Sequence, residues 1–207
     1  MTTFGPDDFQ AAANVSRETL ARLKLYVSLL EEWNRLHNLV SAASLAEVWQ
    51  RHVWDSAQLA PFVPATAASL VDLGSGAGFP GLVLALLCDR PGFRVVLYES
   101  IAKKCTFLSE AARRLGLAVE IRNARAEDSP REIFDVITAR ACAPLPRLLS
   151  YATPFLAPAS LCLFLKGQSV GSELTEAHKS WRMRVTEYPS RSHPSGTILV
   201  LEEVRHV

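Results

Sequence analysis

A glycine-rich segment, residues 72–81, carries the residue types from which a nucleotide-binding turn can be built. It reads Asp-Leu-Gly-Ser-Gly-Ala-Gly-Phe-Pro-Gly and follows the apolar residues Leu70 and Val71. An apolar run that stops at glycines is typical of a buried parallel strand. Glycine then lets the backbone adopt positive φ and approach a ligand closely. Pro80 suits the first turn of a following helix, so we predict a strand, a ligand-binding turn and a helix.

Two nucleotide patterns overlap in this turn. Gly76-Ala-Gly78-Phe-Pro-Gly81 fits the dinucleotide pattern G-x-G-x-x-G, and Asp72-Leu-Gly74-Ser-Gly76-Ala-Gly78 fits the S-adenosyl-L-methionine (SAM) pattern D-x-G-x-G-x-G. SAM carries a sulfonium and an ammonium, which the Asp72 carboxylate would attract, whereas a carboxylate would repel a pyrophosphate. We therefore predict SAM as the cofactor, with Gly74, Gly76 and Gly78 among its binding residues.

Acidic residues follow the next two predicted strands. Glu99 ends the strand 94–98, where a carboxylate can accept hydrogen bonds from ribose hydroxyls. Ala126 and Glu127 follow the strand 117–121 at the same rim of the sheet. We predict that they contact the adenine base, with an exposed loop acid as the alternative for Glu127.

Two cations end the later strands. Arg140 follows the strand 134–138, and Lys166 follows the strand 160–165. Because both lie over the predicted site, we expect Arg140 and Lys166 to contact ligand or substrate. Phe79 either forms an apolar wall for the cofactor or packs in the core.

Other reaction classes lack their characteristic residues. The sequence has no Asp/Asn-Pro-Pro-Tyr/Phe motif after the fourth strand, and no tyrosine is followed by a lysine four positions later. These absences disfavour methylation of an amino group of adenine or cytosine and short-chain dehydrogenase chemistry. The five histidines lack metal-site spacing, and the four cysteines are predicted to be reduced core residues, so we expect no metal. His52 and Asp55 are spaced as a local pair on a helix.

Alternating elements must position these residues. Residues 1–64 predict helices, one of them opened by a capping box at Ser44–Glu47, that act as a packing cap or a substrate-recognition element. The predicted later elements are strands at 70–73, 94–98, 117–121, 134–138 and 160–165, helices at 101–115 and 169–182, and an antiparallel pair at 185–188 and 197–201. This pattern predicts a Rossmann-like, mostly parallel seven-stranded α/β sheet with helices on both faces. We expect one domain, residues 1–207, with a helical extension (1–64) and a SAM-binding core (65–207).

Composition is that of an ordinary globular protein. The 207 residues are 49% hydrophobic and 21% charged, with a net charge of +1. No apolar stretch reaches the ~20 residues of a membrane helix, and no secretion signal is visible, so we expect a cytoplasmic protein. The mild basic bias of residues 103–147 is far from that of a protein that binds many phosphates.

Segments along the chain resemble one family. They are Trp33-Asn34, Asn38-Leu-Val-Ser41, Arg51-His52, Asp55-Ser56, Asp72 to Gly81, Glu99-Ser100, Lys103-Lys104, Phe107-Leu108, Arg125-Ala-Glu127, Ala139-Arg140-Ala141 and Lys166-Gly167. In this order and spacing the chain resembles the GidB/RsmG family, bacterial methyltransferases of small-subunit (16S) ribosomal RNA. The resemblance covers roughly residues 20–170, and Gly-Phe-Pro-Gly after the glycines is unusual among SAM enzymes generally.

The resemblance implies transfer of the SAM methyl group to N7 of one guanine in 16S rRNA, alone or within a small ribosomal subunit. It also implies that Gly74, Phe79, Ala126, Glu127 and Arg140 line the cofactor site. Guanine N7 has a free lone pair, so no general base is expected. The guanine must lie in an open loop or be splayed out to be reached. We expect a monomer.

Three alternatives stay open. The near-neutral charge is compatible with a small-molecule SAM methyltransferase. The glycines Gly76, Gly78 and Gly81 also fit a nicotinamide-dependent reductase. A non-catalytic nucleotide-binding module is the third.

Overall fold

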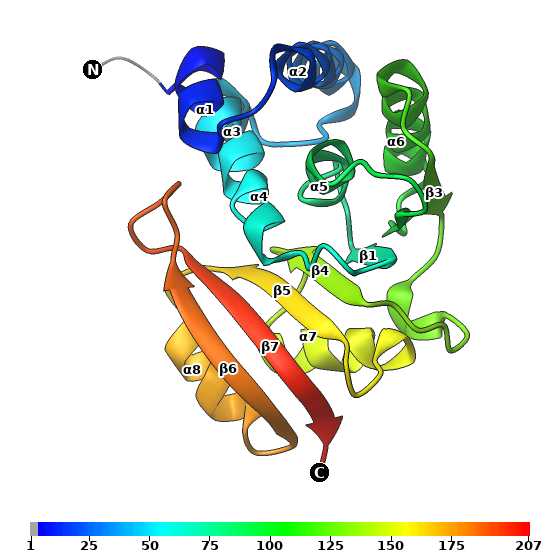
Figure 1. Ribbon diagram of the computed structural model, residues 1–207, viewed down its shortest axis with the longest axis vertical. Coiled ribbons are helices and arrows are strands. Elements are labelled where there is room, and N and C mark those ends of the chain that lie inside the picture. The colour runs from blue at the N-terminus through cyan, green and yellow to red at the C-terminus, as the bar shows by residue number, and fades with distance from the viewer. Residues whose placement is uncertain (1–3) are drawn as a thin grey trace.

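The computed structural model describes residues 4–207, which form a sheet of seven strands flanked by helices (Figure 1). The strand order is β3-β2-β1-β4-β5-β7-β6. The strands are β1 (Ser69–Leu73), β2 (Arg94–Tyr98), β3 (Val119–Arg122), β4 (Val136–Arg140), β5 (Leu161–Lys166), β6 (Trp181–Pro189) and β7 (Thr197–His206). Strands β1 to β5 pair in parallel, whereas β7 pairs antiparallel with both β5 and β6. The predicted Rossmann-like, mostly parallel seven-stranded sheet is confirmed.

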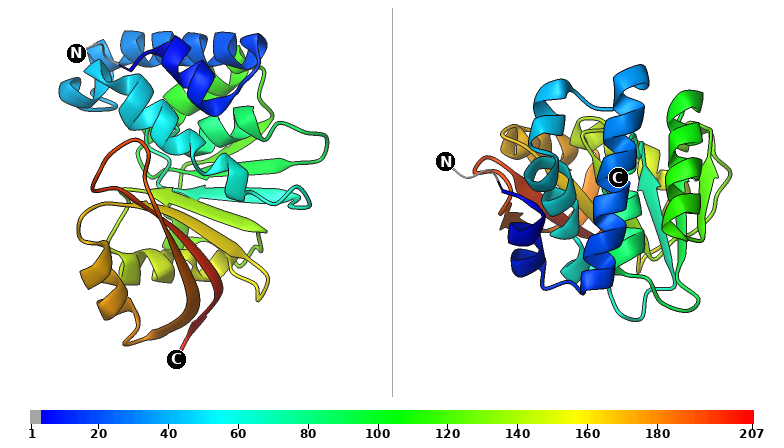
Figure 2. Two further views of the ribbon diagram at one scale, coloured as in Figure 1. Left: turned by 60° about the vertical axis from the view of Figure 1, so that its left-hand side comes forward. Right: turned by 90° about the horizontal axis from the view of Figure 1, so that it is seen from above.

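Helices cover both faces of this sheet (Figures 1 and 2). One face carries α2 (Arg17–His37), α5 (Gly81–Leu87) and α6 (Ala102–Leu115), and the other carries α7 (Leu145–Ala152) and α8 (Val170–Ala177). Side chains alternate along each strand, so Leu70 belongs to the first core while Val71 and Leu73 belong to the second.

The remaining N-terminal elements pack into the first core. They are α1 (Pro6–Ala13), α3 (Ala42–Ala46), the π-helix η1 (Trp49–Trp54), α4 (Asp55–Ala57) and the 3₁₀ helix η2 (Ala60–Phe62). Phe9, Leu23 and Tyr26 are completely buried in the same cluster as Leu70. No helix within residues 4–207 is long and apolar enough to cross a membrane.

Three element boundaries differ from the predictions. Ser41, not Ser44, caps α3 and accepts a hydrogen bond from the Ser44 amide at 3.2 Å. Strand β3 begins at Val119 because the Leu117 amide donates to Ala112 at the end of α6. Helix α8 ends at Ala177, since Trp181 is buried in the second core and opens β6.

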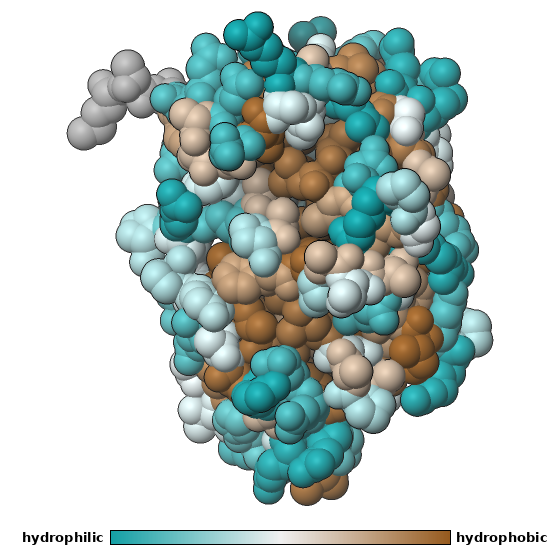
Figure 3. Space-filling view, in the orientation of Figure 1, coloured by the Kyte–Doolittle hydropathy of each residue, from teal (hydrophilic) through white to brown (hydrophobic). Residues whose placement is uncertain are grey.

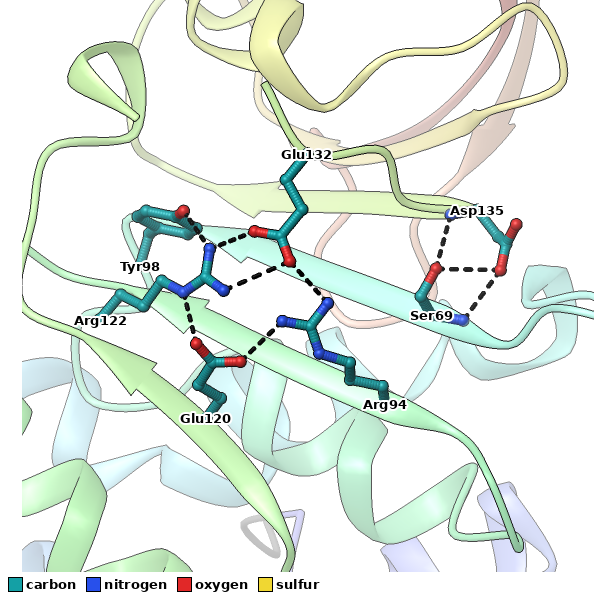
Figure 4. Close-up of polar contacts among 7 residues, drawn as sticks. All are labelled: Ser69, Arg94, Tyr98, Glu120, Arg122, Glu132 and Asp135. Carbon is teal, nitrogen blue, oxygen red and sulfur yellow. Dashed lines mark hydrogen bonds and ion pairs between the residues drawn. The ribbon is translucent and has the colours of Figure 1, made fainter. Parts of the chain in front are cut away.

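The β3–β4 connection contains only one 3₁₀ turn, and ion pairs bridge the neighbouring strands (Figure 4). Arg94 lies 2.7 Å from both Glu120 and Glu132. Arg122 lies 2.6 Å from Glu120 and also pairs with Glu132. Two arginines and two glutamates thus form a closed ring that joins β2, β3 and the chain entering β4.

Candidate active site

The glycine turn after β1 is shaped by positive backbone angles. The φ values of Gly74, Gly76 and Gly78 are +67°, +59° and +95°. A Cβ at Gly74 would lie 2.7 Å from the Cys142 Sγ, and one at Gly78 would lie 2.6 Å from Leu82. Gly74 and Gly78 therefore need glycine for two reasons, their backbone conformation and the close approach of neighbouring side chains.

Asp72 lies beneath this turn and is fully buried. Its Oδ1 accepts a hydrogen bond from the Thr138 hydroxyl at 2.8 Å, and its Oδ2 accepts one from the Gly81 amide at 3.2 Å. Burial raises the pKa of Asp72 to about 6. The carboxylate therefore holds β4 and the start of α5 from beneath the turn, and its attraction for the cofactor's cationic groups stays a prediction.

Glu99 at the end of β2 is joined to the turn. Its Oε2 accepts from the Gly76 amide at 2.9 Å, and its Oε1 accepts from the Ile101 amide at 2.8 Å. A carboxylate has about four acceptor positions, so Glu99 retains capacity for further donors.

Four of the predicted cofactor residues line one cavity of about 170 Å³. They are Gly74, Glu99, Ala126 and Glu127. Ala126 and Glu127 belong to the 3₁₀ helix η3 (Ala126–Asp128), and the Glu127 carboxylate lies 3.6 Å from Arg125. The structure thus brings together residues from β1, β2 and the chain after β3.

Phe79 is placed differently, in the first core beneath the turn. Only 2% of its surface is exposed, and its ring lies 5.2 Å from that of Tyr26. The His52 imidazole stacks on it at 4.9 Å with an interplanar angle of 22°. Of the two predicted roles for Phe79, the structure supports core packing, and a cofactor contact stays a prediction.

Arg140 lines a second cavity, of about 460 Å³. Its guanidinium lies 5.2 Å above the Phe79 ring and donates a hydrogen bond from Nη1 to the Arg51 carbonyl at 2.8 Å. The same nitrogen lies 3.6 Å from Asp55 Oδ2. Arg140 is thus separated from the four residues of the first cavity.

Residues 140–142 separate the two cavities. Arg140 and Ala141 line the larger one, whereas Cys142 lines the smaller one. Ala141 has a φ of +49°, a conformation that non-glycine residues adopt rarely. Consecutive residues of one segment therefore line both cavities.

Lys166 also lines the second cavity, but its ammonium group already has partners within the protein. It lies 2.5 Å from Glu173 and donates to the Ala143 carbonyl at 2.9 Å, and only 8% of its side chain is exposed. Glu173 also accepts from the Leu145 amide at 2.7 Å, so Lys166 and Glu173 together fix the start of α7.

The predicted pairing of His52 with Asp55 is wrong. Neither His52 ring nitrogen bonds to any group among the described residues, and burial, with Arg140 and Arg51, lowers the pKa of His52 to about 3. Asp55 instead accepts a hydrogen bond from the Ser192 hydroxyl at 2.6 Å. No sequence signal marks Ser192, because the contact joins residues 137 positions apart.

The cysteine prediction needs one correction. Cys88, Cys105 and Cys162 are buried, but Cys142 is exposed. It follows β4 at the mouth of the smaller cavity rather than within the strand.

A larger cavity lies away from these residues. It measures about 680 Å³ and is lined by the α1–α2 connection, η2 and the end of β6, including Ala13, Phe62 and Pro189. Figure 3 shows apolar residues gathered along the middle of one face of the molecule. None of the predicted site residues is part of the described lining of this cavity.

Comparison with known proteins decides the family. The family model described as rRNA small subunit methyltransferase G matches residues 19–196. The chain belongs to this family. It is 50% identical to ribosomal RNA small subunit methyltransferase G of Rhodospirillum centenum, over 98% of this chain and 92% of that protein. Identity to the protein of the same name from Caulobacter vibrioides is 44%, over 96% of this chain and 92% of that protein.

Family membership confirms the predicted enzyme class, a methyltransferase of small-subunit rRNA, and the predicted cofactor, SAM. Solved structures support the fold alone. The SAM complex of the O-methyltransferase TomG from Streptomyces achromogenes has a TM-score of 0.56 at 16% identity, over 87% of this chain and 89% of that chain. The Podospora anserina methyltransferase PaMTH1, bound to SAH, has a TM-score of 0.57 at 15% identity, over 90% of this chain and 96% of that chain.

Proposed function

We propose that this protein transfers the methyl group of SAM to N7 of one guanine in 16S rRNA. The observation that carries the proposal is the pair of cavities on either side of residues 140–142, at the carboxyl ends of the parallel strands. Ligands of open α/β sheets bind at this edge. Family membership supports rRNA as the substrate class.

The smaller cavity fits the cofactor by the chemistry of its lining. Glu99 has acceptor positions left for ribose hydroxyls, and Gly74 allows close approach of a ligand to the backbone. At about 170 Å³ the cavity is smaller than the roughly 300 Å³ at which ligand pockets begin. We therefore expect the side chains of Arg125 and Tyr151, which also line it, to move aside on binding.

The reaction requires orientation more than proton transfer. SAM supplies an electrophilic methyl group on a positively charged sulfur. Guanine N7 has a free lone pair, so none of the residues that line the two cavities has to remove a proton. Positioning of two reactants contributes up to about 7–11 kcal/mol to a barrier of this kind. The chain contributes to this positioning by holding Arg140, at the end of β4, through its contacts with Asp55, Arg51 and Phe79.

The protein is further proposed to act in the cytoplasm as a monomer, on RNA alone or within a small subunit. Its net charge of +1 supports a substrate whose folded RNA or ribosomal proteins contribute to recognition.

The test uses ribosomal RNA from a strain that lacks this gene. Small subunits and naked rRNA are incubated separately with methyl-labelled SAM, and the digested nucleosides are identified by mass spectrometry. We expect label in 7-methylguanosine, and the better substrate identifies the assembly state that is methylated. Label in another nucleoside, or none in RNA while SAM still binds, would overturn the proposal. A reaction without enzyme is the control.

A further inference from the structure

A further cavity, apart from the two at the carboxyl edge of the sheet, has mostly apolar walls. It is the cavity of about 680 Å³ between the α1–α2 connection, η2 and the end of β6. Trp54, Phe62 and Tyr188 contribute aromatic rings from η1, η2 and β6, and the rings of Phe62 and Tyr188 lie 4.8 Å apart. Ile198 of β7 belongs both to the lining and to the first core, so the cavity extends down to the core.

The size and the walls of this cavity fit the apolar part of a small ligand. Small-ligand pockets measure roughly 300–1,000 Å³ and combine apolar walls with a few polar groups that orient the ligand. Tyr188 is 41% exposed beside Phe62, and apolar surface that is gathered in one place marks binding sites more often than single exposed residues do.

Arg191 is the one charged residue in the described lining of this cavity. Its guanidinium lies 5.1 Å above the Trp54 ring, and within residues 4–207 it has neither a carboxylate partner nor a hydrogen bond. A guanidinium that stacks on a ring keeps the N–H groups along its edge, which can donate in pairs to a carboxylate. The cavity therefore combines apolar walls with a single uncompensated positive charge.

The backbone that carries this charge is fixed before any ligand binds. The Arg191 amide donates to Gln58 Oε1 at 2.5 Å, and Gln58 Nε2 donates to Ser190 Oγ at 3.3 Å. Gln58 is itself buried, and the neighbouring Ser192 donates to Asp55 at 2.6 Å. Because the loop is already ordered, less conformational entropy is lost when a ligand pairs with Arg191.

We infer that this cavity binds a small amphipathic carboxylate. Its apolar chain or ring packs against the aromatic walls, and its carboxylate pairs with Arg191. One cation matches the single negative charge of a carboxylate, whereas a phosphate dianion or a nucleic acid would need further cations, which the described lining does not offer. The inference is independent of the proposed function, because it uses none of the residues assigned to SAM or to the guanine.

The test is isothermal titration calorimetry of the full chain with octanoate and with 1-octanol, which has the same apolar chain but no charge. We expect one octanoate per chain and at least tenfold weaker binding of 1-octanol. R191Q keeps the backbone bond to Gln58 but loses the charge, so it should weaken octanoate at least tenfold and leave 1-octanol unchanged. R147Q is the matched control, since Arg147 is also exposed and lies 5.4 Å above the Tyr151 ring, outside this cavity. It should bind octanoate as the wild type does.

A second variant tests the cavity itself. Ala13 is half-buried in the lining, so A13W should fill the space and weaken octanoate and 1-octanol alike. Unfolding temperatures show whether each variant is folded, and R191Q decides the charge contact by itself if A13W does not fold.

Four results would overturn the inference. They are no binding of octanoate to the wild type, equal affinity of the wild type for octanoate and 1-octanol, wild-type affinity of R191Q for octanoate, and a dimer in sedimentation that A13W dissociates, which would make a second copy the occupant. Failure to form 7-methylguanosine would overturn the proposed function alone, because the titration involves neither RNA nor SAM.

Discussion

At the scale of single residues, Asp72 supports the active-site turn from below. Its carboxylate contacts Thr138 of β4 and the Gly81 amide of α5, and it is fully buried. These bonds favour the ionised form, but burial dominates and raises the pKa of Asp72 from 3.8 to about 6. Asp72 therefore couples the stability of the site to pH.

Replacement of Asp72 by Asn should remove that coupling. The folded protein binds a proton at Asp72 more tightly than the unfolded chain, so its contribution to stability is largest below pH 4 and is lost as pH rises through 6. Between pH 4 and 7 the free energy of unfolding of the wild type should fall by about 2 kcal/mol relative to D72N. Urea unfolding of both proteins across this range measures the difference.

The comparison with D72N also separates the effect of Asp72 on the pH dependence of stability from that of His52. The pKa of His52 is lowered to about 3, so its contribution to the stability of the folded protein is present above pH 6.5 and is lost as pH falls. This pH dependence is opposite to that of Asp72. Because both proteins contain His52, its effect cancels in the difference. Parallel curves for the two proteins would show that Asp72 does not titrate in this range.

Cys142 offers a direct probe of the cofactor cavity. It is exposed and lines that cavity, whereas Cys88, Cys105 and Cys162 are buried. The residue is exposed as a whole, but its sulfur packs beside Gly74, and this partial burial raises the pKa of Cys142. Alkylation should therefore be slow at neutral pH and faster at alkaline pH. We expect one thiol per native chain to react and SAM to slow the reaction, as followed by mass spectrometry. C142S should remain unlabelled, and equal labelling with saturating SAM would contradict the assignment of the cavity.

At the scale of elements, the packing of α5 against the sheet depends on Gly81. A Cβ at this position would collide with Leu97 and lie 2.7 Å from Asp72 Oδ2. Gly171 of α8 has no atom within 4 Å of its ideal Cβ position and negative φ. The two glycines therefore form a matched pair for mutation.

Gly81→Ala should destabilise the protein by about 1–3 kcal/mol, because the added methyl group overpacks the joint between β1, β2 and α5. Gly171→Ala should stabilise it by about 0.4–1 kcal/mol by restricting the unfolded chain. Chemical denaturation measures both changes. Equal effects of the two substitutions would contradict this account of Gly81.

The N-terminal helices fill the first of the two roles that the sequence left as alternatives, that of a packing cap. Leu23 and Tyr26 of α2 pack in the first core. Arg51 and His52 of η1, with Asp55 of α4, line the larger cavity beside residues 140–142. The N-terminal extension therefore packs against the core and also lines this cavity, and its part in substrate recognition stays a proposal.

At the scale of the whole molecule, charge is balanced locally as well as in total. The net charge is +1, and many cations are already paired, as in the ring formed by Arg94, Arg122, Glu120 and Glu132. Twelve of the 22 lysine and arginine side chains lie in ion pairs among the described residues, so fewer than half are unpaired and available for phosphates. Recognition of rRNA should therefore depend on shape and on the acceptor base more than on charge.

The salt dependence of RNA binding tests this point. Each phosphate contact contributes about −0.7 to the slope of log K against log salt for a single strand. We expect a slope corresponding to roughly two to four contacts between 50 and 200 mM salt. Filter binding of naked 16S rRNA and of small subunits measures both slopes. A slope that corresponds to ten contacts would contradict the prediction.

The sequence by itself determined the elements, the family and the glycine turn. Gly74 and Gly78 are local requirements, since their backbone angles and crowded Cβ positions exclude other residues. Strand and helix periodicity is also local, which is why the fold and the strand ends at Glu99 and Arg140 were predicted. The boundary at Leu117 was missed because the end of α6 competes with the strand for its amide.

Only the tertiary structure decided which of these residues meet. The pleat of β1 turns Asp72 under the turn, and the packing of η1 places His52 on Phe79. The contact of Asp55 with Ser192 joins the two ends of the chain. Such contacts depend on how distant elements are oriented, which local propensity and spacing do not specify. For the same reason, the division of the site into two cavities on either side of residues 140–142 became visible only in the folded chain.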